Sequence, residues 1–171
     1  MLVYKDVISG DELFSDSYPI KLVDDLYYEV DGKNVSYSND IDEALIGGNK
    51  AAEAGEEDEG VDSSAVTGIN VVINGKLVET GFDKATFKDW LKTYMKKLSE
   101  IVAKNNPDRL DKFKSGMQKF AAQVLKNLDE YRFYTGERMD PDGMVILSGY
   151  REDQITPYFI FFKDGLEEEK F

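Results

Sequence analysis

Two residue types are absent from this chain of 171 residues, cysteine and histidine. Without cysteine there are no disulfides, thiol nucleophiles, thiolate zinc sites or iron–sulfur clusters. Without histidine there are no imidazole metal ligands, and the base of Ser-His and Cys-His catalysis is missing. Because most hydrolase and metalloenzyme chemistries need one of these residues, we expect a protein that is not an enzyme and requires no cofactor.

Long apolar runs are missing as well. No stretch reaches the roughly 18 residues of a membrane span, and Lys5 and Asp6 interrupt the N-terminal residues where a signal peptide would be apolar. We therefore expect a cytoplasmic protein. The net charge of −13 disfavours nucleic acid and anionic membrane as main partners. A hydrophobic content of 42%, with ten Tyr and ten Phe, suffices for the core of a single domain over residues 1–171.

Residues 83–128 predict a pair of antiparallel amphipathic helices. In the first helix the apolar residues recur at helical spacing at Phe87, Leu91, Tyr94, Leu98 and Ile101. In the second helix the same spacing gives Leu110, Phe113, Met117, Phe120, Val124 and Leu128. Asp83 is the expected N-cap, with Phe82 and Phe87 as a hydrophobic staple. Asn106 can cap the second helix, with Pro107 at its first position.

This helical hairpin is the basic part of an acidic protein. Residues 84–126 hold eleven Lys or Arg against four acids, a net +7, so the remainder of the −13 chain carries −20. One row follows the helix surface at steps of four: Lys84, Lys88, Lys92 and Lys96. The row is either a solvated face that balances the acidic remainder or a docking surface for an acidic partner.

Residues 38–64 have the opposite character. Between residues 42 and 62 there are eight acids, one lysine and no aromatic residue, so the segment cannot bury enough apolar area to offset its ordering entropy. We predict a long mobile acidic loop. Its clustered carboxylates are either simply solvated or a weak calcium site: Glu56, Glu57, Asp58 and Glu59.

The remaining segments predict antiparallel strands before and after the hairpin, an α+β class. Ser9 to Glu12 predicts a turn that presents Asp11 and Glu12. Asp31-Gly32 suits a two-residue β-hairpin, and Asn74-Gly75 is either another hairpin or a kink in one long strand. Residues 157–163 are apolar on both faces and predict a central strand. We expect residues 167–169 to be a solvated tail.

Two motifs carry a resemblance to a known family. Ile46 to Glu53 includes Gly47, Gly48 and Asn49 and is similar to the first signature of the translationally controlled tumour protein family, also called the fortilin or histamine-releasing factor family. The second signature is matched by Leu128, Phe133, Tyr134, Thr135, Gly136, Glu137, Asp142, Gly143, Met144, Val145 and Tyr150. The chain resembles this family along its whole length.

The resemblance implies a β-tent fold, similar to a Rab-GTPase chaperone, with a protruding helical hairpin and a disordered acidic loop. It favours one long strand at Asn74-Gly75. It implies an abundant, growth-associated, cytosolic regulator linked to protein synthesis through the elongation-factor complex, to calcium, and to stabilisation of microtubules. Tubulin contact would fall on the lysine row of the hairpin.

The resemblance also implies regulation of a small GTPase of the Rheb type, with nucleotide exchange as the associated activity. The family's glutamate for GTPase contact corresponds to Glu12, next to Asp11, although Glu12 could equally be a turn carboxylate that caps a backbone amine. The alternative is a holdase-like chaperone or an anti-apoptotic interaction protein without exchange activity. Where animal members carry a regulated serine this chain has Ala44, and where they end in cysteine it has Phe171. We therefore expect a monomer without disulfide dimers.

Overall fold

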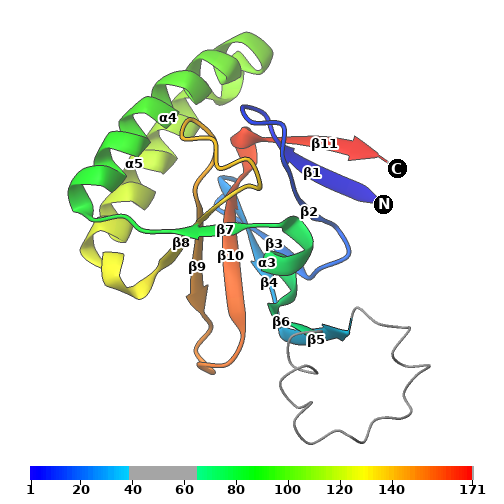
Figure 1. Cartoon of the computed structure of the whole chain (residues 1–171). Helices are drawn as coiled ribbons and strands as arrows, with labels where there is room; N and C mark the ends of the chain where they lie inside the picture. The colour runs from blue at the N-terminus through cyan, green and yellow to red at the C-terminus, as the bar shows by residue number, and fades with distance from the viewer. Residues whose placement is uncertain (39–64, 171) are drawn as a thin grey trace, which may run out of the picture.

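The computed structural model describes residues 1–38 and 65–170 (Figure 1). Its strands are β1 (Leu2–Asp6), β2 (Glu12–Ser15), β3 (Ile20–Val23), β4 (Tyr27–Asp31), β5 (Asn34–Ser38), β6 (Ala65–Ile69), β7 (Val78–Thr80), β8 (Arg132–Thr135), β9 (Ile146–Tyr150), β10 (Pro157–Phe162) and β11 (Leu166–Lys170). Its helices are α3 (Asn70–Gly75), α4 (Lys84–Asn105) and α5 (Leu110–Lys126), with 3₁₀ turns η1 (Pro107–Arg109), η2 (Leu128–Glu130) and η3 (Lys163–Gly165). The expected α+β class is confirmed.

The strands form three antiparallel sheets. Six strands lie in the order β3-β4-β10-β9-β8-β7, three in the order β11-β1-β2, and β5 pairs with β6. The six-stranded sheet has β10 near its centre, where Phe159 and Phe161 are fully buried. This confirms the central strand expected from its apolar faces. In the three-stranded sheet β1 lies between β2 and β11, which brings the two ends of the chain together (Figure 1).

Helices α4 and α5 lie side by side against the six-stranded sheet (Figure 1). The contact is largely aromatic: the ring of Phe162 on β10 lies 6.1 Å from Tyr94 on α4 and 5.4 Å from Phe120 on α5, between ring centroids. Phe133 on β8 lies 5.7 Å from Phe87. Offset and edge-to-face rings of this kind add about 0.5–1.5 kcal/mol per pair beyond the area they bury, so the sheet holds the hairpin firmly.

Of the two N-terminal caps that the sequence predicts for the hairpin, the structure contains one. Asp83 caps α4 as expected: its carboxylate accepts a hydrogen bond from the Thr86 N–H at 2.8 Å, and Thr86 Oγ1 accepts one from the Asp83 N–H at 2.9 Å. Asn106 makes no capping hydrogen bond with its side chain, so that prediction is wrong. Pro107 with its fixed φ begins a 3₁₀ turn, and α5 follows without a side-chain cap.

Residues 70–75 form helix α3, so neither the hairpin nor the long strand expected there is present. The side chain of Asn70 accepts hydrogen bonds from the N–H groups of Val71 at 2.8 Å and Lys33 at 2.9 Å. The helix ends at Lys76 in the left-handed conformation, with φ 54°. These tertiary and capping contacts override the β propensity of the sequence.

The turn expected at Asp31-Gly32 is also absent. The Gly32 N–H donates to the Pro157 carbonyl at 2.8 Å, and a Cβ at residue 32 would lie 2.9 Å from the side chain of Ile69. β4 therefore pairs with β10 on this side, and β5 pairs with β6 instead of returning along β4. Residues 167–169 belong to β11, paired with β1, and are not a tail.

Residues 39–64 lie outside the described residues. The acidic loop expected there, the first signature (Gly47, Gly48, Asn49 and Glu53) and the expected calcium ligands (Glu56, Glu57, Asp58 and Glu59) consequently stay predictions. Within the part of the chain that the structure describes, no helix is both long enough and apolar enough to cross a membrane.

Candidate interaction surfaces

The four lysines of the predicted row are all exposed on α4, and we call them the α4 lysine face: Lys84, Lys88, Lys92 and Lys96. The opposite side of the helix is buried through Phe87, Tyr94 and Leu98. None of the four forms an ion pair or a side-chain hydrogen bond with a described residue. Within the described part of the chain their charges are therefore unpaired.

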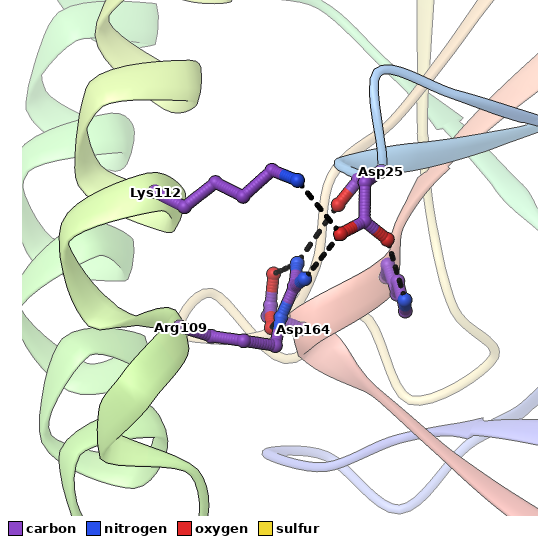
Figure 2. A network of polar contacts seen from close by, with 5 residues as sticks. Asp25, Arg109, Lys112 and Asp164 are labelled. Atoms are coloured by element: carbon purple, nitrogen blue, oxygen red, sulfur yellow. Dashed lines mark hydrogen bonds and ion pairs between the residues drawn. The ribbon is translucent and has the colours of Figure 1, made fainter.

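Other cations of the hairpin are engaged in holding the fold together. Lys97 pairs with Asp142 at 2.8 Å, which links α4 to the loop before β9. Arg109 lies at the centre of a network with Asp25, Lys112, Asp164 and Lys163 (Figure 2). The neighbours Lys96 and Lys97 thus differ, because Lys97 pairs with Asp142 while Lys96 has no such partner among the described residues.

The guanidinium of Arg109 binds two carboxylates. Its Nε and Nη2 donate to the two oxygens of Asp164 at 2.7 and 2.8 Å, and Nη1 donates to Asp25 Oδ2 at 2.7 Å. Nη2 also donates to the Asp25 carbonyl at 2.8 Å. This fork matches the planar geometry of arginine, which lysine cannot reproduce. The network joins the start of α5 to η3 and to the β3–β4 turn.

Asp25 is the point at which three cations converge. Hydrogen bonds from Lys163, Lys112 and Arg109 hold the pKa of its carboxyl well below the usual range. The same contacts with Asp164 and Asp25 raise the pKa of Arg109 still further above that of a free guanidinium. Asp24 and Asp25 both have left-handed backbone, with φ of 53° and 55°, which aspartate tolerates better than most residues.

Asp11, expected to face a partner, is instead buried, with 7% of its surface exposed. Its carboxylate accepts hydrogen bonds from Ser9 Oγ at 3.1 Å and from the Arg138 N–H at 3.3 Å. Arg138 Nη1 donates in turn to the Ser9 carbonyl at 2.7 Å. A Cβ at Gly136 would overlap the Asp11 carboxylate, so the glycine is required. Asp11 therefore joins the turn before β2 to the turn after β8.

Glu12, the next residue, is exposed at the start of β2. It lies opposite Lys5 in the β1–β2 pair, and the ammonium group of Lys5 pairs with Glu169 at 3.1 Å. Among the described residues the side chain of Glu12 has no hydrogen-bond or ion-pair partner, and in particular it caps no backbone amine. Its buried neighbour Asp11 fixes the turn that presents it.

The second signature is mainly architectural. Phe133 and Tyr134 are buried in β8, and Asp142 binds Lys97. The Gly143 carbonyl accepts a hydrogen bond from Trp90 Nε1 at 3.0 Å, and the residue leaves no room for a side chain beside Asp6. Glu137 is exposed, 3.8 Å from Lys76. These residues connect α4, β8 and the β1 turn, so their pattern does not by itself mark a binding site.

Sequence reasoning missed the Arg109 network altogether. A signal was present, because Arg109 is the one arginine among eleven basic residues of the hairpin. Arginine is preferred over lysine where carboxylates are bound in a partly buried, bidentate geometry. Within residues 1–38 and 65–170, no group of three or more acidic side chains is arranged to hold a metal ion.

The fold and its surfaces define an α+β protein in which a helical hairpin is held against an antiparallel sheet. One face of the hairpin carries lysines that no other described residue pairs. The sequence model of the family described as "Translationally controlled tumour protein" matches residues 1–167. The chain belongs to the translationally controlled tumour protein family.

Individual relatives agree with this assignment. The chain is 50% identical to a translationally-controlled tumor protein homolog of Branchiostoma belcheri, over all of both chains, and 48% identical to the human protein, over 99% of both chains. Among solved structures, it is similar to the Translationally Controlled Tumor-associated Protein p23fyp of Schizosaccharomyces pombe, with a TM-score of 0.81, 47% identity and complete coverage of both chains. The Caenorhabditis elegans protein matches with a TM-score of 0.73 and 38% identity, covering 100% of this chain and 99% of that one.

Proposed function

We propose that this protein is a cytoplasmic regulatory binding protein, without catalytic activity of its own, that docks acidic protein segments on the α4 lysine face. The observation that carries the proposal is the row of four exposed ammonium groups, unpaired among the residues that the structure describes, on a helix whose other side is buried. At about 1.5 Å per residue the row from Lys84 to Lys96 spans about 18 Å. An extended peptide covers that length with about five or six residues.

The acidic tails of tubulin are the partner class that we propose for this face, with stabilisation of microtubules as the outcome. The family resemblance supports the choice of tubulin, and the charge complementarity supports the location. Because the lysines are exposed, their attraction is screened over a Debye length of about 10 Å at 0.1 M salt and about 3 Å at 1 M. Binding should therefore weaken steeply as salt rises.

Co-sedimentation with microtubules tests this proposal. The variant Lys88→Glu/Lys92→Glu should lose most of its binding at 0.1 M salt. The matched control is Lys114→Glu/Lys119→Glu, which makes the same charge change at exposed positions of α5 and should retain binding. Equal loss in both variants would show that only net charge matters, and indifference of wild-type binding to salt and to both variants would rule out the proposal.

A second function, regulation of a Rheb-type small GTPase, has its own support. Glu12 is exposed and its side chain has no partner within residues 1–38 and 65–170, while the buried Asp11 holds the turn beside it. We propose that Glu12 contacts the GTPase directly and that Asp11 only positions the turn. The nucleotide-free GTPase should bind the wild type and the Glu152→Val control, but Glu12→Val only poorly. If wild type and Glu12→Val bind equally, the role of Glu12 is refuted.

Weak calcium binding and contact with the elongation-factor complex complete the proposal. Calcium binding is supported by the clustered carboxylates of residues 56–59, because hard cations prefer oxygen ligands. Calorimetry with CaCl₂ should give a heat of binding that disappears when these four residues are changed together to Gln and Asn. The link to protein synthesis is supported by the family alone.

A further inference from the structure

A groove lies between the C-terminal end of α4 and the three-stranded sheet, and we call it the α4–β11 groove. Its volume is about 680 Å³, within the range of about 300–1,000 Å³ typical of ligand sites. Its lining includes Tyr4, Tyr28, Val102, Lys104, Leu166 and Glu168. None of these belongs to the α4 lysine face.

The groove continues along α4 into a second hollow of about 380 Å³, and the two share Val7, Ile101 and Lys104. Val7, Ile101 and Ile8 give the second hollow apolar walls. The two hollows are therefore adjacent. Two adjacent hollows can take two nearby side chains of one bound chain segment.

One wall of the groove offers hydrogen-bond acceptors. Among the described residues, the hydroxyl groups of Tyr4 and Tyr28 have no hydrogen-bond partner. Burial is the main reason that the pKa of both phenols is raised, and the negative charge of Glu168 raises both further. The carboxylate of Glu168 therefore gives this wall a negative charge.

The register of β1 and β11 explains why Glu168 belongs to this wall. Glu168 lies opposite Tyr4, on the same face of the sheet, whereas Glu169 points to the other face and pairs with Lys5. Glu168 has no ion-pair partner among the described residues. Glu169 is therefore paired with Lys5 on the other face of the sheet, whereas Glu168 lines the groove and is unpaired among the described residues.

The cations that line the same region are mostly neutralised. Arg109 binds Asp164 and Asp25, and Lys163 binds Asp25 at 2.7 Å. Lys104 stands on the α4 side, opposite the β11 wall. Lys104 has no ion-pair partner among the described residues. On the β1–β11 wall, the unpaired carboxylate beside the two phenols is that of Glu168, and its complement is a cation.

We propose that the α4–β11 groove binds an extended segment of a partner protein that carries an arginine or lysine within a few residues of a bulky apolar side chain. The cationic head group pairs with Glu168 and donates hydrogen bonds to the hydroxyl oxygens of Tyr4 and Tyr28. The apolar side chain packs against Val7 and Ile101 in the second hollow. The groove would thus bind a basic segment, whereas the α4 lysine face is proposed to bind an acidic one.

The test uses a blocked peptide, acetyl-Leu-Ala-Arg-amide, and its citrulline analogue, which keeps the shape of arginine without its charge. In NMR titrations of the full chain, the arginine peptide should shift the signals of Tyr4, Tyr28, Ile101 and Val102, and the citrulline peptide should bind less tightly. Glu168→Gln should weaken binding of the arginine peptide about two- to fivefold, the range expected for a solvent-accessible ion pair. Glu169→Gln, the matched control, should leave it unchanged.

Three outcomes would overturn the proposal. The arginine peptide could fail to shift the groove signals, the two glutamate variants could weaken binding equally, or ethylguanidinium alone could bind as tightly as the peptide. The last outcome would make the groove a site for free organic cations. Thermal unfolding followed by the fluorescence of Trp90 shows whether each variant is folded, so a loss of binding can be assigned to the groove.

Discussion

Arg109 is the residue whose replacement should damage this fold most clearly. Its side chain is 16% exposed and that of Asp164 is 7% exposed, so the pair between them is largely removed from water. Arg109→Ala deletes two hydrogen bonds to Asp164 and two to Asp25. The variant leaves the carboxylate of Asp164 buried without its guanidinium.

The size of the loss follows from that orphaned charge. Removing one partner of a buried pair costs about 3–5 kcal/mol, and in a chain of this length each kcal/mol lowers Tm by about 2–4 °C. Arg109→Ala should therefore lower Tm by about 10 °C. Arg109→Lys keeps the charge but loses the fork, so we expect a smaller loss of about 1.5–3 kcal/mol.

Urea unfolding followed by circular dichroism and by the fluorescence of Trp90 on α4 measures these losses. The control is Lys112→Met, because Lys112 is 58% exposed and its pair with Asp25 should be worth less than about 1 kcal/mol. Adding Asp164→Asn to Arg109→Ala should recover part of the loss by removing the orphaned charge. If Arg109→Ala costs no more than Lys112→Met, or if Asp164→Asn recovers nothing, the reasoning is refuted.

Three further predictions concern titration and packing. Burial raises the pKa of Tyr27 and Tyr131 to about 12, so both should ionise late when absorbance at 295 nm is followed. Since an unfolded tyrosine ionises near pH 10, their contribution to stability is full below pH 10 and should be lost between about pH 10 and 12; Tyr27→Phe should remove one late-ionising group. Asp25 has a lowered pKa, so its contribution is present above the unfolded value of about 3.9 and is lost as pH falls further; Asp25→Asn should flatten the acid limb of a plot of urea midpoint against pH. The Tyr94 hydroxyl is buried without a partner among the described residues, and a Cβ at Gly165 would overlap it. Tyr94→Phe should be nearly neutral in thermal unfolding, Gly165→Ala should cost about 1–3 kcal/mol, and the double variant should be more stable than Gly165→Ala; a double variant no better than that single one would refute the overlap.

Local patterns predicted the parts of this fold that local interactions determine. The periodicity of apolar residues identified α4 and α5, and the Asp83 cap depends on contacts only three residues away. The two apolar faces of β10 predicted its central place because a strand buried on both sides needs no polar face. These signals operate within a few residues of the chain.

Elements decided by distant contacts were predicted wrongly. Helix α3 depends on the hydrogen bond from the Lys33 N–H to Asn70, 37 residues along the chain, and β11 exists because β1 lies beside it. No property of residues 167–169 by themselves indicates that strand. β-propensity is a weak guide where such tertiary contacts decide.

The candidate surfaces follow the same division. The α4 lysine face was predictable, since helical spacing alone puts its members in one row. The burial of Asp11 was not, because it depends on Arg138, which follows more than 120 residues later. The α4–β11 groove requires β1, β4, α4 and β11 to be assembled first.

The place of β10 and β11 in the sheets has a consequence for biosynthesis. A ribosome synthesises these strands after all the other elements that the structure describes, yet β10 fills the centre of one sheet and β11 completes the other. Until they emerge, β4 and β9 lack the neighbour between them, and the aromatic side of the α4–α5 pair lacks Phe162. Nascent chains that stop before β10 should therefore be open to proteases and chaperones. Folding to the native state must then wait until β10 and β11 have left the ribosome.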